Sequence, residues 1–92
     1  MSHPIEREVQ IVNRLGLHAR AAAKLVTLAA RFRADVRIRK DGREVSGKSI
    51  MGVLMLAAAQ GSSITLITEG DDAREAIDAL SELVANKFDE EA

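Results

Sequence analysis

Apolar and polar residues alternate along several short stretches of the chain, which is the pattern of strands with one buried face. The alternation predicts strands at residues 5–12, 35–40 and 63–69, and residues 43–45 are expected to form a strand that returns along residues 35–40. Asp41-Gly42 separates the second strand from the third and is typical of a two-residue hairpin turn. Arg7 interrupts the apolar series of the first strand, which favours an edge position or a later start.

Other stretches place apolar residues three or four positions apart, the spacing of a helix that buries one face. Helices are predicted at residues 19–32, 50–56 and 73–88. Leu25, Leu28, Ala29 and Phe32 should face the core from the first of these. Ser49 is a natural N-cap for the second. Residues 89–91 are acidic, and the last four residues, 89–92, are expected to fray.

The predicted order of elements is β-α-β-β-α-β-α. One tight hairpin and helical connections imply a mostly antiparallel sheet. Because the strands alternate, all helices should cover the same face of the sheet. We therefore expect an α+β fold, an open-faced two-layer sandwich, formed by a single domain over residues 1–92.

Composition narrows the possible functions. Thirteen basic and fourteen acidic residues give a net charge of −1, which does not favour a partner such as DNA that is held by bulk electrostatics. The chain has no cysteine, so it has no disulfide and no thiolate metal site. No metal or cofactor is expected. No apolar run is long enough for membrane insertion, and the first residues do not form a signal peptide. We expect a cytoplasmic monomer.

The stretch Gly16-Leu17-His18-Ala19-Arg20 precedes the first predicted helix. An isolated histidine in a loop is usually an ordinary solvated side chain, but His18 stands where helix N–H groups lack partners and the helix dipole is positive. Such a place suits a phosphate, and imidazole is a nitrogen nucleophile near neutral pH. Arg20 is disfavoured by the dipole unless it binds an oxyanion. With no glycine-rich phosphate loop to bind a nucleotide, the chain should relay a phosphoryl group rather than act as an enzyme.

Two motifs resemble those of a known family. Residues 16–22, Gly-Leu-His-Ala-Arg-Ala-Ala, resemble the active-site signature of the HPr phosphocarriers of the bacterial phosphotransferase system. Residues 48–53, Lys-Ser-Ile-Met-Gly-Val, resemble the regulatory-serine motif of that family. The resemblance implies a four-stranded antiparallel sheet covered by three helices. It also implies phosphorylation of His18 at Nδ1, with the phosphate held by Arg20 and the Ala19 N–H. The implied donor is Enzyme I charged by phosphoenolpyruvate, and the implied acceptors are IIA-type proteins.

The chain departs from the family pattern at two positions. Ala21 replaces the usual proline, which restores an N–H in the first helical turn. Leu15 replaces the small polar residue that often caps near the site. The run over residues 13–24 resembles the nitrogen-related NPr branch more than the sugar-transport branch.

The second predicted helix is apolar nearly all round, so it either packs wholly in the core or offers a docking patch. By resemblance it lies beside His18, and the residues expected to contact partners are Leu17, Ala22, Ile50, Met51 and Leu54. Ser49 is either a plain N-cap or a regulatory phosphorylation site for an HPr serine kinase/phosphorylase.

Basic residues cluster between Arg31 and Arg43. They favour a solvated strand face, but they also leave open a non-catalytic regulatory or RNA-binding α+β domain. The strands lack the stacking aromatic residues that RNA-binding sheets use, so we expect no nucleic-acid partner.

Overall fold

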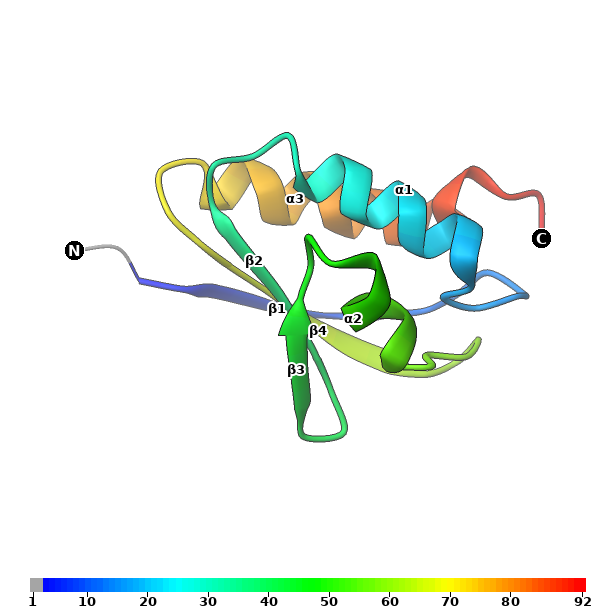
Figure 1. Ribbon diagram of the computed structural model, residues 1–92. Helices are drawn as coiled ribbons and strands as arrows, with labels where there is room; N and C mark the ends of the chain where they lie inside the picture. The colour runs from blue at the N-terminus through cyan, green and yellow to red at the C-terminus, as the bar shows by residue number, and fades with distance from the viewer. Residues whose placement is uncertain (1–2) are drawn as a thin grey trace.

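The computed structural model describes residues 3–92, and a sheet forms one layer of the molecule (Figure 1). Its strands pair in the order β1-β4-β2-β3, and every pair is antiparallel. The strands are β1 (Ile5–Gln10), β2 (Asp35–Lys40), β3 (Arg43–Ser46) and β4 (Ser63–Glu69). The Asp41-Gly42 hairpin is confirmed, with positive φ angles of 52° and 80° at the two turn residues, as a type I′ turn requires.

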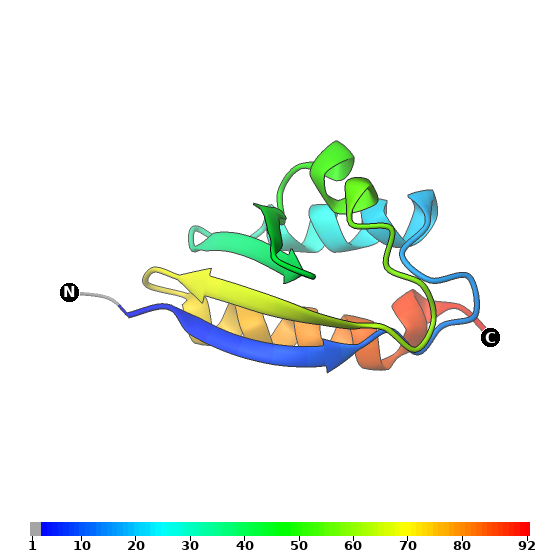
Figure 2. The same cartoon turned by 90° about the horizontal axis from the view of Figure 1, so that it is seen from below.

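The helices form the second layer (Figures 1 and 2). They are α1 (Ala19–Ala29), α2 (Ile50–Met55) and α3 (Ala73–Ala85), and a short 3-10 turn, η1, follows at Lys87–Asp89. The α3 helix packs on β1 and β4, whereas α2 packs against β3 and α1. The predicted α+β open sandwich is therefore confirmed, and the described residues contain no helix long and apolar enough to cross a membrane.

The core lies between the two layers. Val36 and Ile38 of β2 and Ile64 and Leu66 of β4 are almost completely buried, as their alternation predicts. Ile67 breaks the alternation, because it is 2% exposed on the outer face of the sheet. It pairs in register with Arg37, and the aliphatic part of a neighbouring arginine can cover apolar surface of this kind.

The position of β1 in the sheet explains how Arg7 can interrupt the apolar series of this strand. Of the two expected alternatives the edge position is confirmed: β1 lies at the edge of the sheet and begins at Ile5, and Arg7 shares the face of Ile5 and Val9. At the edge its guanidinium reaches Asp78 at 2.9 Å and Ser81 at 3.2 Å, both on α3. A charged residue therefore occupies an inward position without being buried unpaired.

The predicted bounds need correction at both long helices. The first helix ends at Ala29 rather than Phe32, because the N–H groups of Arg31 and Phe32 turn back to Leu28 and Ala29. The α3 helix ends at Ala85, and Phe88 reaches the core from the following turn instead of from the helix. The expectation that residues 89–92 fray is wrong, since they bond to the loop that precedes α1.

Candidate functional site

His18 is the N-cap of α1, as its position before an alanine-rich helix predicts. Its backbone is extended, and its carbonyl accepts the N–H of Ala22 at 2.8 Å, the first bond of the helix. Its side chain also takes part in capping, because the N–H of Arg20 donates to His18 Nδ1 at 3.4 Å. A backbone N–H can only donate, so Nδ1 is an acceptor and carries a lone pair.

The loop before His18 is fixed by close packing. Gly16 has a φ of +68°, and a Cβ at this position would lie 2.6 Å from the Ala58 carbonyl oxygen. The next residue, Leu17, donates its N–H to the same oxygen at 2.8 Å. Asn13 is fully buried, and its Nδ2 donates to the Gly16 carbonyl at 2.7 Å. The backbone that carries His18 therefore has little freedom.

Glu90 is a partner of His18 that sequence reasoning missed. Its Oε2 lies 2.5 Å from His18 Nε2, and its Oε1 accepts Asn13 Nδ2 at 3.0 Å. Burial acts to raise the pKa of Glu90, but the hydrogen bonds from His18 and Asn13 outweigh it and lower the pKa below the usual range. Glu90 is thus a carboxylate at neutral pH, an acceptor for the Nε2–H. The only signal in the sequence was the acidic run at residues 89–91.

The first turn of α1 leaves donors for an anion. Among residues 3–92, no hydrogen bond engages the N–H groups of Ala19 and Ala21, and Arg20 is exposed without an ion-pair partner. A groove of about 700 Å³ beside His18 is lined by Arg20, Lys24 and Glu90, among other residues. Backbone donors, a guanidinium and open space together can accommodate a phosphate. No group of three potential metal ligands occurs within the described residues.

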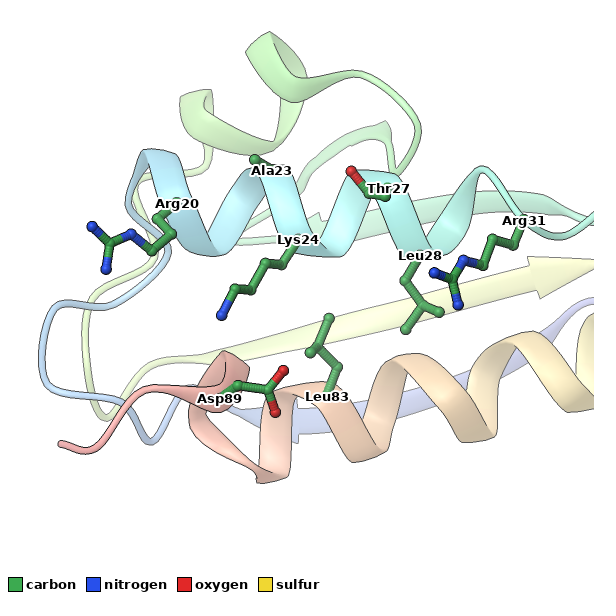
Figure 3. Close-up of a pocket in the computed structure, with 8 residues that line it drawn as sticks. All are labelled: Arg20, Ala23, Lys24, Thr27, Leu28, Arg31, Leu83 and Asp89. Atoms are coloured by element: carbon green, nitrogen blue, oxygen red, sulfur yellow. The ribbon is translucent and has the colours of Figure 1, made fainter.

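A second groove, of about 420 Å³, continues this surface between α1 and α3 (Figure 3). Leu28 and Leu83 face each other across it, while Lys24 points toward Asp89. Arg20 and Arg31 stand at its two ends (Figure 3). The surface next to His18 is therefore apolar at its centre and cationic along α1.

Ser49 caps α2 as predicted, since its Oγ accepts the Gly52 N–H at 3.1 Å. The helix is not wholly in the core: Met51 is 67% exposed, Ile50 is 40% exposed and Leu54 is half-buried. Leu17 and Ala22, however, are only 4% and 0% exposed. The expectation that these two offer contact surface to a partner is wrong, because both side chains pack into the core beneath α1.

Leu15, where the family often has a small polar residue, is 64% exposed and caps nothing. Asn13 and His18 itself make the polar contacts that hold this loop and the helix entrance. These contacts hold the loop although Leu15 supplies no polar side chain to cap the helix.

The basic residues of the sheet are largely neutralised. Arg37 forms ion pairs with Asp35, Glu44 and Glu69, and Arg39 pairs with Glu6 and again with Glu44. These acids leave the outer face of the sheet with little excess positive charge for a phosphate backbone. This arrangement supports the solvated-face interpretation of the cluster.

Comparisons with known proteins identify the family of this chain. The family described as "PTS HPr component phosphorylation site" matches residues 5–86. The chain is 55% identical to a phosphocarrier protein HPr of Cupriavidus necator, over 94% of this chain and 97% of the relative. It is 49% identical to a phosphocarrier protein NPr of Shewanella violacea, over 94% of each. A crystal structure of HPr from Thermoanaerobacter tengcongensis superposes with a TM-score of 0.92 at 44% identity, covering 96% of this chain and 99% of that one. The chain therefore belongs to the HPr family of the phosphotransferase system, and it is a phosphocarrier protein rather than an enzyme.

Proposed function

We propose that this protein, acting as one domain, accepts a phosphoryl group on Nδ1 of His18 from Enzyme I charged by phosphoenolpyruvate and passes it to IIA-type proteins. The observation that carries the proposal is the lone pair of Nδ1 at the N-terminus of α1. A nucleophile there meets the positive end of a helix dipole and unpaired N–H groups. Phosphoryl transfer depends mainly on such positioning and charge stabilisation.

Each residue of the site has a proposed role in the phosphorylated state. The Nδ1 lone pair bonds to phosphorus, which releases the Arg20 N–H from its contact with the ring. That N–H and the free N–H of Ala19 then donate to phosphate oxygens. The Arg20 guanidinium, which has no ion-pair partner within residues 3–92, neutralises part of the added charge.

Labelling with Enzyme I and radioactive phosphoenolpyruvate tests the proposal. Wild type should take up one acid-labile phosphate, His18→Ala should take up none, and Arg20→Ala should react more slowly. Equal labelling of wild type and His18→Ala would overturn the assignment of His18. Parallel reactions with sugar-type and nitrogen-type Enzyme I would show which branch the protein serves.

We further propose that α2 contributes to the docking surface for these partners. Ile50 and Met51 expose apolar surface on a helix that packs beside α1, and exposed methionine adapts to several partners. Met51→Ser should weaken transfer from Enzyme I without changing the urea midpoint. Leu17→Ser, which alters a buried side chain, should instead destabilise the fold. Unchanged transfer kinetics in Met51→Ser would contradict the docking role.

We also propose that Ser49 is a regulatory phosphorylation site for an HPr serine kinase/phosphorylase. A phosphate on Ser49 would keep contact with the N-terminal N–H groups of α2 and would add close to two negative charges to the docking surface. Ser49→Asp should therefore slow transfer from Enzyme I and leave the fold intact. Ser49→Ala is the matched control, because it loses about 1 kcal/mol of capping but adds no charge. If the two variants accept phosphate at the same rate, charge at this position does not regulate docking.

The RNA-binding alternative gains no specific support from this arrangement. Arg37 and Arg39 of the sheet form ion pairs with Glu44 and Glu6, and the strands of the described residues carry no aromatic side chain. Salt-sensitive RNA binding by a protein that takes up no phosphate would reverse this preference.

A further inference from the structure

Residues 87–92 fold back onto the loop that carries His18 (Figures 1 and 2). Three consecutive residues, Lys87, Phe88 and Asp89, have positive φ angles of 60°, 53° and 63°, a conformation that is unfavourable for residues other than glycine. The surroundings hold this turn in place. The Phe88 side chain is fully buried, and Lys24 Nζ donates to the Phe88 carbonyl at 2.7 Å.

The strained turn delivers Glu90 to a defined position. One carboxylate oxygen meets His18 Nε2, and the other meets Asn13 Nδ2. Asn13 also holds the Gly16 carbonyl, and a backbone oxygen of Ala92 accepts the Arg14 N–H at 3.0 Å. The segment is thus joined to the histidine loop through both side chains and backbone.

These contacts select one form of the imidazole ring. Nδ1 accepts from the Arg20 N–H, and Nε2 faces a carboxylate that can only accept. A neutral ring satisfies both partners only when the proton is on Nε2 and the lone pair is on Nδ1. Carboxylates that fix a histidine tautomer in this way are familiar from hydrolases.

We propose that Glu90 is a positioning residue for phosphoryl transfer: it holds the His18 ring in the tautomer whose Nδ1 is the nucleophile and stabilises the positive charge that the ring gains. This inference rests on the proposed function of His18. Glu90 acts through the ring and touches Nε2, on the side away from the reacting nitrogen.

The reaction balances without loss of a proton. The Nδ1 lone pair forms a bond to phosphorus, while the bond from phosphorus to the phosphorylated donor protein breaks and its electron pair stays with the donor. The Nε2 proton remains on the ring, so the product is an N-phosphoryl imidazolium paired with the Glu90 carboxylate. When an acceptor protein takes the phosphoryl group, the electron pair of the Nδ1–P bond returns to Nδ1 and the neutral tautomer is restored.

The contacts of Glu90 predict an unusual order of variants. In Glu90→Gln, Asn13 should hold the amide oxygen, which turns the amide NH₂ toward His18 Nε2. The ring would then carry its proton on Nδ1, and the nucleophilic lone pair would be lost. Glu90→Ala leaves Nε2 to water, so that only the Arg20 N–H still favours a lone pair on Nδ1. Transfer should therefore be slower in Glu90→Gln than in Glu90→Ala, although glutamine is the closer mimic. Against wild type we expect a loss of at least about tenfold for Glu90→Gln.

The experiment combines ¹⁵N NMR of the His18 ring with transfer rates from phosphorylated Enzyme I. Glu91→Gln is the matched control, because it removes one charge from the same segment and His18 makes its side-chain hydrogen bond and ion pair with Glu90, not with Glu91. We expect the Nε2–H tautomer to dominate in wild type and Glu91→Gln and the Nδ1–H tautomer to dominate in Glu90→Gln. A wild-type tautomer and rate in Glu90→Gln would overturn the proposal.

The NMR measurement uses unphosphorylated protein, so it separates this inference from the proposed function. If wild type shows the expected tautomer but His18 takes up no phosphate, the function proposed for His18 fails while the Glu90 contact stands. If His18 takes up phosphate at equal rates in all variants, Glu90 has no positioning role. If Glu90 only stabilised the fold, Glu90→Gln and Glu90→Ala would both lower the urea midpoint, but neither would move the proton of the His18 ring from Nε2 to Nδ1.

Discussion

Gly16 offers the sharpest test of how the fold constrains the histidine loop. Its φ is +68°, a region that alanine enters only at a cost. A Cβ would also lie 2.6 Å from the Ala58 carbonyl oxygen and 3.0 Å from Ala59 Cα. Both obstacles are backbone atoms, so no flexible side chain can move aside. Gly16→Ala therefore combines an unfavourable dihedral angle with a steric clash.

The two contributions can be estimated separately. An alanine in the left-handed region loses about 1 to 2 kcal/mol, and forcing a methyl group into packed surroundings costs about 1 to 3 kcal/mol. The sum, about 2 to 5 kcal/mol, is a large part of the stability of about 5 to 14 kcal/mol that a domain of this length has. The clash should also push the loop away from Ala58, which accepts the Leu17 N–H directly before His18.

Gly42→Ala is the matched control. Gly42 has a φ of +80°, but among the described residues other than Gly42 and its two chain neighbours, no heavy atom lies within 4 Å of its Cβ position. Gly42→Ala should therefore lose only the free energy that an alanine costs in the left-handed region, without the cost of a steric clash. Urea denaturation at pH 7 would give both free energies of unfolding, with the same slope if unfolding remains two-state. Equal losses in the two variants would refute the close approach of Gly16 to Ala58.

Three further predictions concern stability. The Asp72 carboxylate accepts the N–H of Arg33 at 2.9 Å and the N–H of Ala34 at 2.8 Å, and these bonds lower the pKa of Asp72 although burial acts to raise it. The stability that Asp72 contributes is therefore present above its pKa in the unfolded chain and is lost as the pH falls through its pKa in the folded protein. The stability difference between wild type and Asp72→Asn should thus be full at pH 7 and shrink below about pH 4, and a difference that does not change with pH would contradict this. Ala21→Pro should raise the melting temperature by about 2 to 4 °C, because its N–H makes no hydrogen bond within residues 3–92 and proline restricts the unfolded chain; a decrease would mean that the buried site cannot hold the ring. Phe88→Ala should cost about 3 to 5 kcal/mol in urea denaturation, since its side chain is fully buried, and a loss below about 1 kcal/mol would show that Phe88 does not anchor the 87–92 segment.

Local periodicity determined most of the fold. The spacing of apolar residues located the three longer strands and the two long helices, because a strand repeats every two residues and a helix every 3.6. Short-range chemistry located the Asp41-Gly42 turn, the Ser49 cap and the place of His18 at the start of α1. All of these depend on groups within a few residues of one another. Arg7 likewise made the edge position of β1 partly predictable, since a charged residue in an apolar strand face is tolerated best at the edge of a sheet.

Only the tertiary structure decided which side chains meet at the site. Leu17 and Ala22 stand beside His18 and Arg20 in sequence, yet packing turns both into the core. Glu90 is separated from His18 by 72 residues, and a left-handed turn without glycine brings it there. Nothing in the local sequence marks that turn, because the free energy that holds it comes from burying Phe88 under distant elements. The histidine was thus predictable from its own helix, whereas the carboxylate that orients it was not.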